Sequence, residues 1–111
     1  MSDIAHHPLF PLAFRTVLEL GSGVGLTGIA LCRSCKPRKY VFSDCHPTVL
    51  QKLRMNVELN SQDLTDVSLC VEELDWEGVS EDSLTDINAN TVIAAGRTES
   101  LFSPMKNNNH K

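Results

Sequence analysis

The sequence lacks any long run of apolar residues, which argues against a membrane-spanning segment. In a chain of 111 residues with 41% hydrophobic content, no stretch approaches the roughly 18 apolar residues that a spanning helix needs. The first ten residues have neither a basic start nor an apolar core, so we expect no secretory signal. We therefore expect a cytoplasmic protein with room for one small domain.

Positive charge is nearly absent from the second half of the sequence. Residues 55–111 carry three basic and eleven acidic side chains, whereas residues 1–54 carry seven basic and three acidic ones. No Lys or Arg occurs between Met55 and Gly96. Binding to nucleic acid needs clustered basic side chains, so this distribution argues against a nucleic-acid partner. We interpret the acidic half as a solvated surface.

Cysteine is present only four times, and the pattern does not favour a metal or redox site. A zinc site from Cys32, Cys35, Cys45 and His46 would use two adjacent ligands and would lack a second spaced pair. A redox Cys-x-x-Cys belongs at a helix start after a strand, but Cys32 and Cys35 end a helical stretch. We assign no metal ligands and expect reduced thiols, including Cys70, that act as small hydrophobic side chains.

Short β-rich runs alternate with helical periodicity along most of the chain. The expected elements are strands at 16–20, 39–43, 67–71 and 91–95, helices at 26–35 and from 47 onward, and an acidic loop or short helix at 77–90. This alternation predicts right-handed βαβ units and a mostly parallel sheet. The expected fold is α/β, a Rossmann-like doubly wound sheet that is incomplete, with about four strands instead of the usual six or so.

Four glycines fill the turn between the first strand and the first helix, at positions 21, 23, 25 and 28. Glycine permits a tight turn and the close approach of a ligand, and the helix that follows presents free N–H groups. The spacing Gly23-x-Gly25-x-x-Gly28 matches the dinucleotide fingerprint, which by itself is a weak signal. A nicotinamide-dependent oxidoreductase is one function that this motif would fit.

Two carboxylates accompany the glycine turn. Glu19 lies inside the first strand, where a buried charge needs a partner. Asp44 ends the second strand, where an acid can accept hydrogen bonds from ribose hydroxyls. The alternatives are a solvated strand end for Glu19 and a helix cap before Pro47 for Asp44. Taken together, the turn and the two acids favour a site for an adenosine-containing ligand.

Several segments resemble one family. Residues 16–28, TVLELGSGVGLTG, resemble the first motif of class I, seven-strand S-adenosylmethionine-dependent methyltransferases. Four further segments resemble the protein-lysine methyltransferases among them, those of elongation factor 2 most closely: residues 40–46, 50–57, 74–76 and 92–95. The resemblance covers residues 15–96. It implies S-adenosyl-L-methionine as cofactor, a protein substrate such as elongation factor 2, and lysine N-methylation as the activity.

The resemblance also implies cofactor-binding residues. The turn would lie along the methionine part with Glu19 supporting it, Asp44 would bind the ribose, Trp76 would stack on the adenine and Ala95 would border the pocket. Without the resemblance, Trp76 would be interpreted as a core aromatic residue. The full set is Glu19, Gly21, Ser22, Gly23, Gly25, Asp44, Trp76 and Ala95.

The sequence departs from the family after Ala95. The family continues with Asp-x-x-Tyr, which helps to shape the lysine-accepting site, whereas this chain has Gly96, Arg97, Thr98 and Glu99. We therefore assign no catalytic residue. We expect a divergent segment at 1–14, a partial cofactor-binding domain at 15–96 and a divergent, disordered tail at 97–111. Such a truncated form would be weakly active or inactive alone.

The fourth strand raises an alternative function. It is interior in the family's sheet, so a chain that departs from the family after Ala95 would expose the apolar edge Val92–Ala95. An exposed edge of this kind can pair with another chain. The alternative is a non-catalytic interaction module, which would self-associate or bind a partner through this edge.

Overall fold

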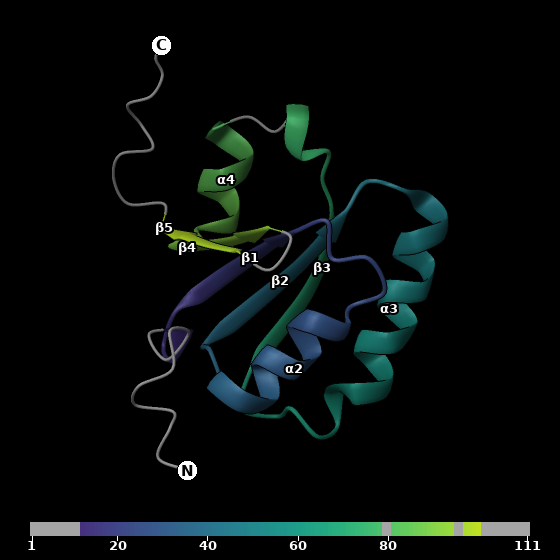
Figure 1. Cartoon of the computed structure of the whole chain (residues 1–111), viewed down its shortest axis with the longest axis vertical. Coiled ribbons are helices and arrows are strands. Elements are labelled where there is room, and N and C mark those ends of the chain that lie inside the picture. Colours follow the sequence, from purple (N-terminus) through teal and green to yellow (C-terminus); the bar gives the residue numbers. More distant parts are fainter. Residues whose placement is uncertain (1–11, 79–80, 95–96, 101–111) are drawn as a thin grey trace.

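Five strands form a single sheet in the order β3-β2-β1-β4-β5 (Figure 1). The computed structural model describes residues 12–78, 81–94 and 97–100. Strands β1 to β4 are parallel to their neighbours, and β5 runs antiparallel to β4. The bounds are Thr16–Leu20 for β1, Lys39–Asp44 for β2, Ser68–Glu73 for β3, Thr91–Ala94 for β4 and Arg97–Ser100 for β5.

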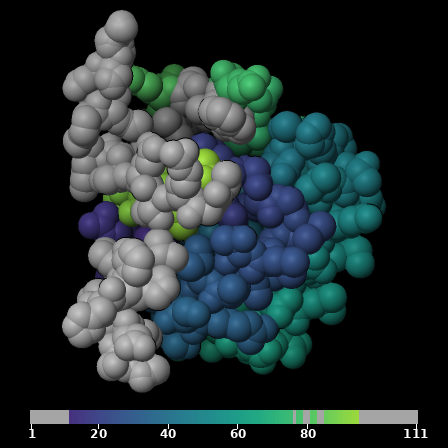
Figure 2. All heavy atoms as spheres, in the orientation of Figure 1, coloured from purple at the N-terminus to yellow at the C-terminus, as the bar shows by residue number. Residues whose placement is uncertain are grey.

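Helices cover both faces of the sheet, with α2 and α3 on one side and α4 on the other (Figure 1). In the space-filling view the blue and teal atoms of α2 and α3 form the lower and right parts of the visible face (Figure 2). The bounds are Leu26–Cys35 for α2, Pro47–Ser61 for α3, Trp76–Gly78 for the short 3₁₀ turn η2, and Glu81–Ile87 for α4. The prediction of an incomplete Rossmann-like sheet with four parallel strands is confirmed. None of the described helices is long and apolar enough to cross a membrane.

The core lies mainly between the sheet and the α2–α3 layer. Tyr40 and Phe42 are fully buried on one face of β2, with ring centroids 4.7 Å apart. Leu50, Leu53 and Val57 recur at helical spacing along α3 and form its buried stripe. Ile29 and Cys32 bury α2 in the same core, which holds the turn before this helix at the carboxyl ends of β1 and β2.

The β4 edge is not exposed, so that expectation is wrong. Strand β5 follows β4 after two residues and pairs along it in antiparallel register, from Ala94↔Arg97 to Thr91↔Ser100. Backbone hydrogen bonding at an open edge does not depend on an apolar pattern in the added strand, and it outweighs the polar composition of Arg97–Ser100. The first four residues of the expected disordered tail are therefore a strand. The interaction module that depended on this edge loses its basis.

Candidate functional site

The turn between β1 and α2 is built on three left-handed glycines. Gly21, Gly23 and Gly25 have φ angles of 68°, 59° and 97°, a region that favours glycine. A Cβ atom on Gly25 would lie 2.9 Å from Leu53 Cδ1, but one on Gly21 or Gly23 would meet no atom within 4 Å. One side of the turn is therefore packed against the core, and the other side is open.

Asp44 joins the end of β2 to this turn. Its Oδ2 accepts a hydrogen bond from the Gly23 N–H at 3.0 Å. Its Oδ1 accepts from the N–H groups of Cys45 at 2.8 Å and His46 at 3.2 Å. Burial alone would raise the pKa of Asp44, but these backbone donors together lower it below its ordinary value. The carboxylate is thus ionised and held in a fixed orientation beside the open side of the turn.

Two serines extend the pairing of β1 and β2 beyond its last parallel pair, Glu19↔Phe42. The Ser22 N–H donates to the Ser43 carbonyl at 2.7 Å, and the Ser43 N–H donates to Ser22 Oγ at 3.0 Å. The Ser43 hydroxyl donates to the Glu19 carbonyl at 2.6 Å. All three residues are buried. Because buried polar groups are costly to leave unpaired, this network fixes where the turn leaves the sheet.

The Glu19 side chain completes the network. Its Oε1 accepts a hydrogen bond from Ser22 Oγ at 3.0 Å. Burial raises the pKa of Glu19, and hydrogen bonding to Ser22 opposes the shift. The neighbouring Tyr40 hydroxyl is buried and has no hydrogen-bond partner of good geometry among the described residues; burial and the charge of Glu19 raise its pKa. Glu19 therefore supports the turn from the buried side, through its hydrogen bond to Ser22, and does not face solvent.

The raised pKa of Glu19 predicts a pH effect on stability. Between the ordinary carboxyl pKa and the raised value, the folded chain holds more protons than the unfolded chain. Stability should therefore fall as pH rises through this window and stay lower above it. Glu19→Gln cannot ionise and keeps an oxygen that accepts from Ser22, so its melting temperature should depend less on pH above the ordinary range of carboxyl pKa values.

The control for this measurement is Glu58→Gln, because Glu58 is exposed on α3. Thermal unfolding of both variants and the parent chain at several pH values gives the comparison. Equal pH dependence in Glu19→Gln and in the parent chain would contradict a buried, destabilising charge at position 19.

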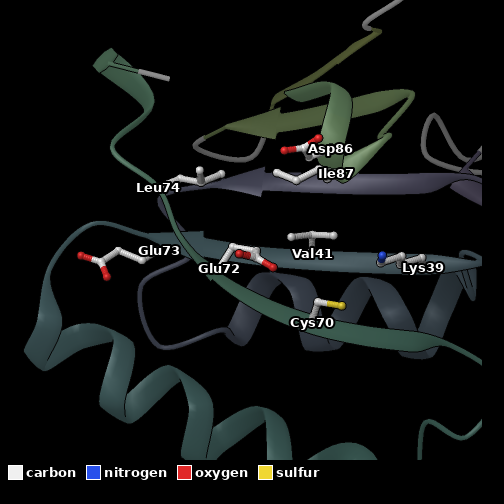
Figure 3. A pocket seen from close by; sticks show the side chains of 8 residues that line it. All are labelled: Lys39, Val41, Cys70, Glu72, Glu73, Leu74, Asp86 and Ile87. Carbon is white, nitrogen blue, oxygen red and sulfur yellow. The ribbon is translucent and has the colours of Figure 1, made fainter. Parts of the chain in front are cut away.

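A hollow apart from the glycine turn lies on the face of the sheet opposite to α2 and α3 (Figure 3). It has a volume of about 320 Å³ and runs beneath the end of α4, across β2 and β3. Neither the glycine turn nor Asp44 lines it, so this hollow is distinct from the candidate site. The candidate site is the open edge beside the turn. The residues that line the hollow are Lys39, Val41, Cys70, Glu72, Glu73, Leu74, Asp86 and Ile87.

Most of the residues singled out in the sequence come together in space. Hydrogen bonds connect five of them at the carboxyl edge of β1 and β2: Glu19, Ser22, Gly23, Gly25 and Asp44. Gly21 lies in the same turn, directly before Ser22. The Leu74 N–H donates to the Asp44 carbonyl at 3.0 Å, which brings the backbone that leads to η2 beside this edge. The Trp76 backbone lies in η2, but its side chain, like all of Ala95, falls outside the described residues.

Sequence reasoning missed Ser43. A small polar residue between Phe42 and Asp44 interrupts an apolar strand, which is a local signal for a hydrogen-bonding role. Its partners, however, are Glu19 and Ser22, more than 20 residues away. Only the register of β1 on β2 identifies them.

Comparison with known proteins gives a consistent picture. A family model described as lysine methyltransferase matches residues 6–102. The protein-lysine N-methyltransferase EEF2KMT of Mus musculus is 48% identical over 95 residues, which cover 77% of this chain and 28% of the mouse protein. The calmodulin-lysine N-methyltransferase of Arabidopsis thaliana is 33% identical over 72 residues, 65% of this chain and 24% of that protein. The chain thus spans about a quarter of the length of these relatives.

Solved structures share the fold. The structure of EvdMO1 matches with a TM-score of 0.60 and 25% identity, over 82% of this chain and 20% of that one. An RNA methyltransferase from Salinibacter ruber, in complex with S-adenosyl-L-homocysteine, matches with a TM-score of 0.57 and 22% identity, over 78% and 51% of the two chains. At this identity the second likeness concerns the fold alone.

Proposed function

The chain belongs to the lysine methyltransferase family, and from this premise we propose that its glycine turn and Asp44 bind S-adenosylmethionine. The turn would lie along the methionine part and Asp44 would accept hydrogen bonds from the ribose hydroxyls. Trp76 beside the adenine and Ala95 at the pocket border complete the proposed site. A partial cofactor-binding domain at residues 15–96 is the unit that carries it.

The observation that carries the proposal is the open side of the turn next to an ionised acid. Gly21 and Gly23 leave free space where side chains would stand, and Asp44 is tied to Gly23 at that same place. Asp44 Oδ2 accepts one protein hydrogen bond, which leaves it able to accept another from a ligand hydroxyl. A ligand with a vicinal diol and a charged amino-acid end fits both features.

The proposed reaction is N-methylation of a lysine in a protein substrate. S-adenosylmethionine, when bound, supplies an electrophilic methyl group, and the protein contributes mainly by positioning it. The described residues fix the cofactor side: Glu19 and Ser22 hold the turn, and Asp44 orients the ribose. The positions that match the family's Asp-x-x-Tyr are Gly96, Arg97, Thr98 and Glu99, so we propose no catalytic residue and weak or no activity for this chain alone.

Elongation factor 2 is the substrate that we propose, because the motifs most resemble methyltransferases that act on it. A translation factor as substrate would place the protein in the cytoplasm. Incubating the chain with elongation factor 2 and radiolabelled cofactor tests the activity. We expect at most trace labelling by the chain alone, and efficient labelling would overturn the proposal of low activity.

Cofactor binding is tested by calorimetric titration with S-adenosylhomocysteine, with NADH as the competing candidate. We expect one S-adenosylhomocysteine per chain and no heat with NADH. Binding of NADH in its place would favour the oxidoreductase alternative, and no binding of either ligand would refute the proposed site. The single tryptophan, Trp76, gives a second readout through its fluorescence.

A hydroxyl deletion at the turn should weaken binding more than its effect on stability explains. Ser22→Ala removes the hydroxyl that accepts from the Ser43 N–H and donates to Glu19 Oε1. We expect about tenfold weaker binding, which corresponds to about 1.4 kcal/mol. The matched control is Thr91→Val, which deletes a buried hydroxyl that accepts from Arg15 Nη1 at 3.1 Å, at the other end of the sheet. Both variants should lower the melting temperature, but only Ser22→Ala should weaken binding. An equal loss of affinity in Ser22→Ala and Thr91→Val would contradict a local role of the Ser22 hydroxyl in binding.

A further inference from the structure

Three metal-ligating side chains follow one another at the carboxyl end of β2. One donor atom each from Asp44, Cys45 and His46 lies within 4.8 Å of the other two. We propose that these three residues bind one Zn²⁺ ion, and that Zn²⁺ and the cofactor exclude each other. The mutual exclusion rests on the proposed function, because Asp44 would bind both ligands. The zinc site itself does not depend on the proposed function.

The backbone already holds the three donors on one side. Asp44 Oδ1 accepts from the N–H groups of Cys45 and His46, so the main chain folds back around the carboxylate. Asp44 Oδ2 accepts one hydrogen bond, from Gly23, and retains capacity for a metal. Cys45 is half-buried and His46 exposed, so both side chains can rotate without disturbing the core.

The distances and the donor types suit zinc. Bond lengths of about 2.0–2.3 Å in a tetrahedral site imply donors roughly 3.3–3.7 Å apart. From separations within 4.8 Å, rotation about the side-chain bonds of Cys45 and His46 closes the gap. A thiolate, an imidazole and a carboxylate favour a borderline-soft ion over Mg²⁺ or Ca²⁺. The partial positive charge at the start of α3 disfavours a cation, but the two anionic donors outweigh it. A water molecule supplies the fourth ligand.

This donor set differs from the one considered from the sequence. Helix α2 runs back along the sheet, so Cys35 at its end lies before the start of β2, whereas Cys45 follows the end of β2. The six residues of β2 span roughly 20 Å, which separates Cys32 and Cys35 from Cys45 and His46. Burial raises the pKa of Cys32 to about 12, which further disfavours a thiolate there. Asp44 takes the place of the Cys-x-x-Cys pair.

Titration of the untagged, reduced chain with Zn²⁺, in competition with a chromophoric chelator, tests the site. We expect one ion per chain, with release of the Cys45 thiol proton to the buffer. Cys45→Ser should weaken binding at least tenfold. The matched control Cys70→Ser removes a half-buried thiol on β3 and should bind as the parent chain does. With Co²⁺ as the probe, thiolate charge-transfer absorption should appear in the parent chain and vanish in Cys45→Ser.

The outcomes separate the two proposals. No zinc binding, or binding lost in Cys35→Ser but kept in Cys45→Ser, would overturn the site. Zinc that binds without weakening S-adenosylhomocysteine binding would overturn the exclusion. If zinc binds as expected but S-adenosylhomocysteine does not bind even without zinc, the zinc site stands and the proposed function fails. Circular dichroism of each variant establishes that a loss of binding is not a loss of fold.

Discussion

Gly28→Ala should destabilise the chain by about 3 kcal/mol, the upper end of the usual cost of overpacking a core. Gly28 lies in α2 where the helix touches the sheet. A Cβ atom there would stand 2.4 Å from Phe42 Cε2, 2.6 Å from Tyr40 Cε1 and 2.9 Å from Glu19 Oε1. The two rings are fully buried, so neither can move away without disturbing the packing of α3. Helix α2 must therefore lift from the sheet, and the glycine turn moves with it.

Thermal unfolding measures this effect. For a domain of this size, 3 kcal/mol corresponds to a fall in melting temperature of roughly 12 °C or more. The matched control is Gly78→Ala in η2, where an added Cβ would meet no atom within 4 Å; we expect no loss there. If both variants melted with the parent chain, the close contact of α2 with β2 would be contradicted. If Gly28→Ala melts too low to give a folded baseline, the unfolding midpoint in urea at low temperature gives the same comparison.

The parallel part of the fold follows from local sequence patterns. The strand predicted at 16–20 is β1, the strand predicted at 91–95 is β4 to within one residue, and the helix predicted from Pro47 is α3. These elements are identifiable because each buries one stripe or an entire strand, which leaves a periodic pattern or a short continuous run of apolar residues. Strand β5 leaves no such signal, because its formation depends on the free edge of β4 and not on its own composition.

The site divides in the same way. The glycines and the two acids are identifiable from residue type and spacing. A glycine marks a position that can take a positive φ angle, and a carboxylate is present wherever Asp or Glu stands, so each is a property of a single position. The hydrogen bonds that join them are not, because they depend on the register of β1 on β2. Glu19 illustrates the difference: its sequence suggests either a solvated strand end or a buried charge, and only the structure shows a 4% exposed carboxyl bonded to Ser22.

Asp44→Asn should weaken S-adenosylhomocysteine binding roughly 100-fold. Hydrogen bonds to a charged group contribute about 1.5–3 kcal/mol each, so the loss of charge at the proposed ribose contact costs up to about 3 kcal/mol, or roughly 100-fold in affinity. The substitution also places an amide N–H₂ where the N–H groups of Gly23, Cys45 and His46 now meet a carboxylate. At least one of these donors loses its acceptor, which should also lower the melting temperature of the variant.

Two comparisons isolate the role of the carboxylate in ligand binding. Asp63→Asn removes an exposed acid whose carboxylate lies 3.8 Å from Arg33 Nη1; such surface pairs contribute about 0–1 kcal/mol, so its affinity should match that of the parent chain. An S-adenosylhomocysteine analogue without ribose hydroxyls should bind the parent chain and Asp44→Asn with similar, weak affinity. If Asp44→Asn weakened the analogue as strongly as the natural ligand, the residue would act by shaping the turn and not by binding the ribose.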